Sequence, residues 1–115
     1  MDAAPALDVE ALVAARIRAG LSQNELARAM GLSSGQRMSR WERGDARPRN
    51  PQMLHSLAAA LGVAPRELLV PMETPDLRWL RFVAGLSVEE LAEAAHVSVS
   101  TLKRWEARGL RDPSP

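Results

Sequence analysis

The fold of this chain is decided by the stretch Gly20-Leu21-Ser22-Gln23-Asn24-Glu25-Leu26-Ala27, which has an echo 65 positions later, Gly85-Leu86-Ser87-Val88-Glu89-Glu90-Leu91-Ala92. Both copies lead to the same triplet, Arg40-Trp41-Glu42 and Arg104-Trp105-Glu106. Residues 12–33 and 77–98 align without a gap and share 11 identities in 22 pairs. The 115-residue chain therefore contains one supersecondary unit twice.

Composition predicts an all-α protein. Hydrophobic residues make up 46% of the chain, which is ordinary for a folded domain, and they are mostly Ala, Leu and Val. There is one Phe and no Tyr, so the aromatic and β-branched runs that mark strands are missing. The absence of cysteine excludes a disulfide framework and thiolate chemistry.

Capping signals divide the first unit into five helices. Ser22 with Glu25 three residues later forms a capping box that opens the second helix, and Gly31 closes it. The remaining boundaries come from similar signals: Gly20 ends the first helix, a third follows Ser33 with Met38 and Trp41 inward, Asn50-Pro51 opens a fourth that runs to Leu61, and Pro65–Leu69 makes a short fifth.

We expect two units joined by a stiff connection. Residues 8–70 form the five-helix unit, residues 71–75 a linker with two prolines, residues 76–109 a three-helix unit, and residues 110–115 a loose tail. Thr74 is the expected cap of the first helix in the second unit, and Gly109 its expected last stop. About 34 residues are too few for a self-sufficient core, so this unit should lean on the first unit or on another chain. Trp79 is the candidate for that contact, with a place in its own unit's core as the alternative.

The net charge of the chain is small, but its basic residues are clustered. The net charge is about +1, yet residues 33–50 hold five arginines and residues 98–111 hold Lys103, Arg104, Arg108 and Arg111. Two basic clusters at the same place in two repeats favour binding of a polyanion over a merely solvated surface.

Together these residues resemble the lambda-repressor/Cro type of helix-turn-helix domain. The resemblance rests on Gly20 to Ala27, Arg40-Trp41-Glu42-Arg43-Gly44, Pro48, and Leu57-Ala58-x-x-Leu61-Gly62-Val63. It implies that the third helix enters the major groove of double-stranded DNA. By position it assigns Gln23 to a backbone phosphate, Gln36, Arg37 and Arg40 to base edges, and Arg43 and Arg47 to flanking phosphates, with Ser34 as a further candidate. It also implies structural ion pairs of Arg16 with Glu42 and of Arg81 with Glu106.

One insertion puts the register of the third helix in question. Leu32 and Met38 are six positions apart, whereas Val97 and Leu102 are five apart. The extra residue either lengthens the turn or distorts the first turn of the helix. Gln36 also has an alternative role, because Ser33-x-x-Gln36 is itself a capping box.

The second unit departs further from the pattern. Val88 replaces Gln23, and His96 stands where Gly31 closes the helix, a turn position that histidine tolerates. The last helix has some features that resemble the MerR type of helix-turn-helix. It exposes Ser100, Lys103, Arg104 and Arg108, which predicts DNA contact, with dimerisation or docking as the alternative.

The sequence thus predicts a sequence-specific, repressor-like transcriptional regulator of bacterial or phage type that binds double-stranded DNA. A homodimer on a palindrome is the favoured assembly, and the other arrangement is that the two units of one chain read adjacent grooves. These are two forms of the DNA-binding prediction. The alternative is a protein-interaction module of an antitoxin or antirepressor pair. His55 and His96 lie far apart, and no nucleophile motif, phosphate loop or metal-ligand spacing is present, so we expect no enzymatic activity, cofactor or small-molecule effector. No apolar run approaches a membrane span and no signal peptide is evident, so we expect a cytoplasmic, nucleoid-associated protein.

Overall fold

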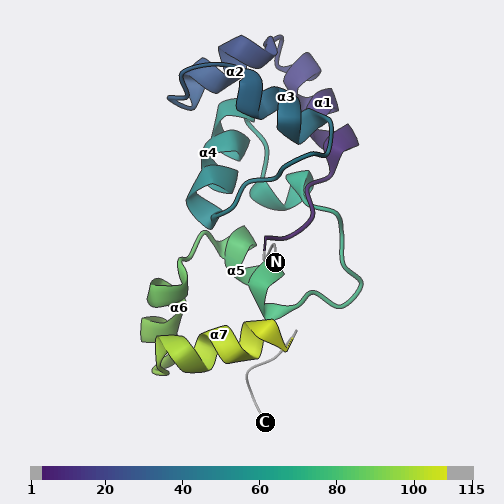
Figure 1. The fold of residues 1–115 in the computed structure, drawn as a ribbon. Coiled ribbons are helices and arrows are strands. Elements are labelled where there is room, and N and C mark those ends of the chain that lie inside the picture. Colours follow the sequence, from purple (N-terminus) through teal and green to yellow (C-terminus); the bar gives the residue numbers. More distant parts are fainter. Residues whose placement is uncertain (1–3, 109–115) are drawn as a thin grey trace.

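The computed structural model describes residues 4–108, and within that range the protein is all-helical with no strand (Figure 1). An isolated antiparallel bridge joins Leu7 to Leu69. Among the described residues, no helix is both long and apolar enough to cross a membrane. The helices are α1 (Val9–Arg18), α2 (Gln23–Ala29), α3 (Gln36–Glu42), α4 (Pro51–Leu61), the 3-10 helix η1 (Pro65–Leu68), α5 (Leu77–Ala84), α6 (Val88–Ala95) and α7 (Val99–Ala107).

The expected capping box at the start of α2 is confirmed, and the second unit has the same box at the start of α6. The Ser22 hydroxyl accepts from the Glu25 amide at 3.0 Å, and the Glu25 carboxylate accepts from the Ser22 amide at 2.8 Å. Ser87 and Glu90 repeat the arrangement with the same two distances. Each box supplies partners for amides at a helix start that have none within the helix, which explains why α2 and α6 begin one residue after a serine.

The start of α3 differs from the expectation. The helix begins at Gln36 rather than directly after Ser33, and no capping box forms between those two residues. The extra residue therefore lengthens the turn. Gly35 is the residue before the helix, and its amide donates to Asn24 Oδ1 on α2 at 2.9 Å. A side chain of α2 thus holds the turn that positions α3.

Adding a methyl group at Gly35 should destabilise the protein. A Cβ there would overlap the Asn24 Oδ1 atom and come within 3.2 Å of the Asn24 backbone nitrogen. We expect Gly35→Ala to lower the free energy of unfolding by about 1–3 kcal/mol, as overpacking does. Urea denaturation measures the change.

A double-mutant cycle with Asn24→Ala checks the cause. Removing the Asn24 side chain loses one hydrogen bond but also removes the obstruction, so the two costs should not add. Strict additivity of the two single variants would show that Gly35 matters for a reason other than its contact with Asn24.

The start of α5 is a second correction. Asp76, not Thr74, precedes the helix, and its carboxylate accepts from the Trp79 amide at 2.8 Å. Thr and Asp are both capping residues, and Asp is the stronger of the two. His96 does adopt the expected left-handed conformation, with φ 59° at the end of α6.

The main hydrophobic core crosses from the first unit into the second. Trp79 and Phe82 of α5 are 5% and 3% exposed, and they belong to the same cluster of buried residues as Leu54 and Leu57 of α4. Figure 1 shows α5 directly below α4. The expectation that Trp79 makes the contact between the units is confirmed.

A much smaller cluster holds the rest of the second unit together. Its buried members are Leu77, Ala92 and Leu102, one from each of α5, α6 and α7. Trp105, the counterpart of the buried Trp41 in the Arg-Trp-Glu triplet, is only partly buried and packs against this cluster. The expected stop at Gly109 and the tail at 110–115 lie outside the described residues.

Candidate nucleic-acid interface

The outer face of α3 is polar and basic because its inner face fills the core. Met38 and Trp41 are buried, at 0% and 2% exposed. Helical periodicity then turns Gln36, Arg37 and Arg40 to the surface, and all three are exposed. Ser34 is exposed in the preceding turn, where its hydroxyl accepts from the Gln36 amide at 3.4 Å.

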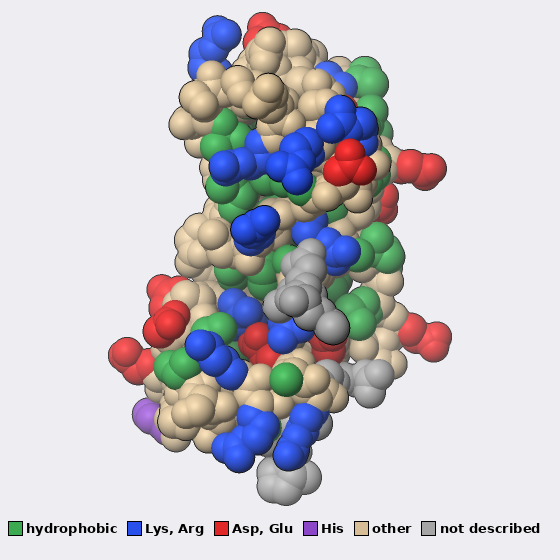
Figure 2. All heavy atoms as spheres, in the orientation of Figure 1, with side chains coloured by type: hydrophobic (Ala, Val, Ile, Leu, Met, Phe, Trp, Pro, Cys, Tyr) green, Lys and Arg blue, Asp and Glu red, His purple; other side chains and the backbone are tan. Residues whose placement is uncertain are grey.

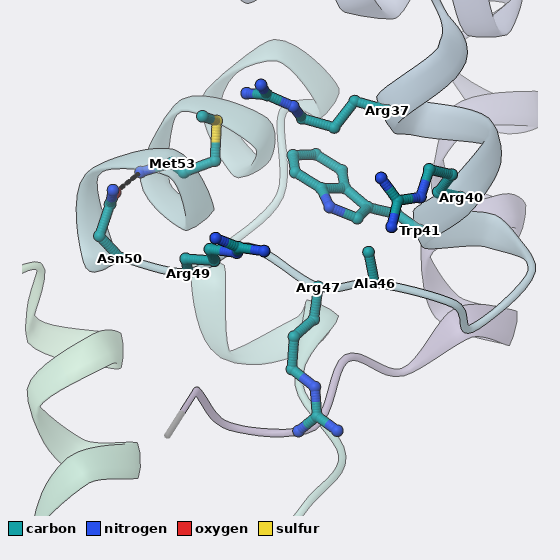
Figure 3. Close-up of a pocket in the computed structure, with 8 residues that line it drawn as sticks. All are labelled: Arg37, Arg40, Trp41, Ala46, Arg47, Arg49, Asn50 and Met53. Atoms are coloured by element: carbon teal, nitrogen blue, oxygen red, sulfur yellow. Dashed lines mark hydrogen bonds between the residues drawn. The ribbon is translucent and has the colours of Figure 1, made fainter. Parts of the chain in front are cut away.

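Beside this face lies a basic hollow between α3 and the start of α4 (Figure 3). Figure 3 shows Arg37, Arg40 and Arg49 around the edge of the Trp41 indole, while Arg47 points away from it. The hollow has a volume of about 350 Å³, and none of its lining residues is acidic. The lining residues are Arg37, Arg40, Trp41, Ala46, Arg47, Arg49, Asn50 and Met53. Such a site attracts anions at short range.

Arg43 and Arg47 are both expected to contact flanking phosphates, but their side chains make different contacts in the structure. Arg43 has a side chain 60% exposed, and its guanidinium contacts Asp45 at 3.0 Å and the Ser39 hydroxyl at 3.1 Å, both at the surface. Arg47 is partly buried and donates from Nη1 to the Ala4 carbonyl at 2.9 Å. Arg47 thus ties the N-terminal segment to the loop after α3, whereas Arg43 is free to turn outward.

Gln23 lies at the start of α2 but is engaged within the fold. Its amide nitrogen donates to Glu42 Oε1 at 3.0 Å. Arg16 binds the same carboxylate through two nitrogens, at 2.5 Å and 3.0 Å, and donates to the Leu21 carbonyl at 2.9 Å. The structure therefore contains the expected Arg16–Glu42 pair and adds Gln23 as a third donor.

The ionisation of Glu42 follows from these contacts. Its carboxylate is 8% exposed, and burial alone would raise the pKa. The hydrogen bonds from Arg16 and Gln23, together with the charge of Arg16, outweigh burial and hold the pKa of Glu42 below its ordinary value of 4.5. The carboxylate in turn raises the pKa of Arg16.

The lowered pKa predicts a specific pH dependence for Glu42→Gln. A group with a lowered folded-state pKa stabilises the fold fully above its unfolded value, here 4.5, and this contribution is lost as the pH falls through the lowered value. We expect the variant to be less stable than the parent by about 1.5–3 kcal/mol at neutral pH. This gap should narrow below pH 4.5, as urea unfolding at several pH values would measure.

The matched control is Glu93→Gln, which removes the same charge from an exposed position on α6. Its unfolding free energy should stay within about 0.5 kcal/mol of the parent at neutral pH. A stability gap for Glu42→Gln that stays constant down to strongly acidic pH would contradict the assignment.

In the second unit the four residues predicted to contact DNA all lie on α7 or directly after it. Ser100, Lys103 and Arg104 lie on α7, Arg108 follows it, and all four are exposed. Arg104 makes a long contact of 3.4 Å to the Thr101 hydroxyl. The helix before it is acidic: α6 exposes Glu89, Glu90 and Glu93, where α2 carries Asn24, Glu25 and Arg28.

The basic side chains of the two units gather on one face of the molecule. Figure 2 shows Lys and Arg side chains over α3 and the loop after it, and again at the opposite end around α7. The acidic side chains on this face lie mainly toward its sides. The face thus carries one basic area over α3, in the half formed by the first unit, and another around α7, on a body 46 Å long.

Arg49 belongs to the basic cluster of residues 33–50 but is not among the site residues predicted from the sequence. It lies in the hollow because Asn50 caps α4, accepting from the Met53 amide at 2.8 Å, and so fixes the chain just after Arg49. The Arg-Pro-Arg-Asn-Pro run of residues 47–51 was the available signal.

Comparison with protein families gives one result, found twice in the chain. The model of a family described as a helix-turn-helix domain matches residues 9–70 and again residues 76–115. Neither the curated proteins nor the solved structures contain a significant match.

Proposed function

Because this chain belongs to the helix-turn-helix domain family, which matches it over both repeats, we propose that it is a sequence-specific, repressor-like regulator that binds double-stranded DNA through α3. The major groove is about 12 Å wide and admits one α-helix with its side chains. The exposed residues of α3 are of the types that bond base edges: arginine pairs with guanine and glutamine with adenine. A regulator of this kind acts in the cytoplasm, at the nucleoid.

The basic hollow beside α3 is the observation that carries this proposal. Arg37, Arg40 and Arg49 converge there without an acidic neighbour among the lining residues. A protein that used α3 only to pack against other helices would have no use for three exposed guanidinium groups around one hollow. Base edges in the groove would bond Arg37 and Arg40, and a phosphate beside the groove would neutralise Arg49.

Selection of DNA from a random duplex pool tests the proposal directly. We expect the full chain to enrich a defined sequence and to protect it from cleavage in a footprinting experiment. A single module buries only about 600–1,000 Å² on DNA, so a homodimer on a palindrome is one way to double the contact. Failure to enrich any sequence at low salt would refute sequence-specific binding.

The different settings of Arg43 and Arg47 predict different effects of their removal. Arg43→Ala should reduce the slope of log affinity against log salt by roughly one unit, because one phosphate contact is lost. Arg47→Ala should instead lower the free energy of unfolding by about 1 kcal/mol, through loss of the bond to the Ala4 carbonyl. Equal salt slopes for Arg43→Ala and the parent would remove Arg43 from the interface.

A further inference from the structure

The second unit is fixed to the first by packing, beyond the connection at residues 71–75. The Trp79 indole nitrogen donates to the Val70 carbonyl at 3.2 Å, and the Arg66 guanidinium lies 5.8 Å from the centre of the same ring. Trp79 and Phe82 both enter the core of the first unit. A helix held by two buried aromatic side chains does not swing freely on its linker.

This contact is present only where the second repeat departs from the first. Trp79 corresponds to Ala14, which is exposed, and Phe82 corresponds to Ile17, which is 65% exposed. The first helix of the repeat therefore does not bury the side chains at these two positions within its own unit. In α5 they serve the junction between the units.

His55 of α4 holds the far end of α5. Its Nε2 atom lies 3.0 Å from the Phe82 carbonyl and 3.0 Å from the Val83 carbonyl, so one N–H is shared between two carbonyls at the end of the helix. Gly85 fits against the imidazole so closely that a Cβ there would come within 2.9 Å of the ring. The chain enters α6 shortly after this point, so the His55 contact lies at the junction from which α6 and α7 follow.

From this junction we propose that one chain reads two segments of a single DNA duplex, α3 contacting one and α7 the other, at a spacing that the α4–α5 contact fixes. The proposal rests on the DNA-binding function above. Its support is that both basic areas lie on one face, and that the body is 46 Å long while successive turns of a major groove are about 34 Å apart.

The acidic surface of α6 makes the two halves unequal. The N-terminal turn of α6 carries Glu89 and Glu90, which would repel a phosphate there. The second unit therefore contacts DNA through α7 and Arg108 alone, and the segment under α3 is the stronger one. The selected site should be asymmetric and bound by one chain.

Spacer insertion in the selected site tests the proposal with the full chain. Inserting 5 bp, about half a turn, between the two protected segments should weaken binding by about tenfold or more and abolish protection under α7. In Trp79→Ala combined with Phe82→Ala, which removes the buried contact between the units, the same insertion should cost less than about threefold, because the freed unit follows the displaced segment. Thermal unfolding verifies that this variant is folded.

A second pair of variants does not depend on the junction. Lys103→Ala combined with Arg104→Ala, both exposed, should remove protection of the α7 segment and leave protection under α3. Arg18→Ala, an exposed arginine beside η1, should keep both. Two outcomes would overturn the proposal that one chain reads both segments, while leaving DNA binding intact. One is a single protected segment whose binding the insertion does not change, and the other is a palindrome bound by two chains. Selection of no DNA would overturn both proposals.

Discussion

Glu106→Ala should lower the free energy of unfolding of the second unit by about 3–5 kcal/mol, since it leaves a buried cation without its partner. Arg81 on α5 binds the Glu106 carboxylate through two nitrogens, at 2.6 Å and 3.1 Å, and Arg78 contacts it at 3.3 Å. The Arg81 and Glu106 side chains are 8% and 3% exposed. Without the carboxylate, Arg81 keeps its 3.0 Å bond to the Leu86 carbonyl and its contact with the Phe82 ring, 5.2 Å from the ring centre, but has no negatively charged partner.

The effect is large because little else holds α7. The separate core of this unit has three buried residues, whereas the first unit shares the large cluster. We therefore expect α6 and α7 to lose amide protection in hydrogen exchange while α1 to α4 keep theirs. Glu93→Ala is the control, an exposed acid removed from the same unit, and it should change stability by less than about 0.5 kcal/mol.

A double variant separates the charge from the packing. Arg81→Met combined with Glu106→Leu leaves no charge of that pair unmatched, so it should recover part of the loss. If Glu106→Ala cost no more than Glu93→Ala, the ion pair would not be what fixes α7 to α5.

The two arginine–glutamate pairs show which contacts could be predicted from the sequence and which could not. The resemblance to a known helix-turn-helix type implies that Arg16 pairs with Glu42 and Arg81 with Glu106, and both pairs are present. The third donor was not foreseen. Gln23 supplies it in the first unit; in the second, where Val88 replaces Gln23, Arg78 supplies it from α5. A position-by-position comparison of the two repeats misses this third donor, because it comes from different positions in the two units.

Two of the expectations that changed depended on contacts distant in sequence. Asn24 bonds the Gly35 amide eleven positions away and decides where α3 begins, against a local capping signal at Ser33. Arg47 bonds the Ala4 carbonyl, 43 positions away. Local propensity and periodicity report on neighbours within a turn or two, so the helices were predictable and these partners were not.

Removing both arginines from the outer face of α3 should have the largest effect on DNA binding. Arg37 and Arg40 flank one hollow, and each bidentate pairing with a base is worth about 1–3 kcal/mol of discrimination. We expect Arg37→Ala with Arg40→Ala to weaken binding to the selected site by at least about 2 kcal/mol, roughly thirtyfold. Both side chains are exposed, so the free energy of unfolding should change little.

The lysine double variant, Arg37→Lys with Arg40→Lys, distinguishes base reading from simple attraction. It keeps both positive charges but loses the planar fork that bonds two acceptors at once. We expect it to retain binding to unrelated DNA and its salt dependence, and to lose most of the preference for the selected site. If the lysine variant discriminated as well as the parent, these arginines would contact phosphates only. The sequence would then be read by Gln36 or by another part of the surface.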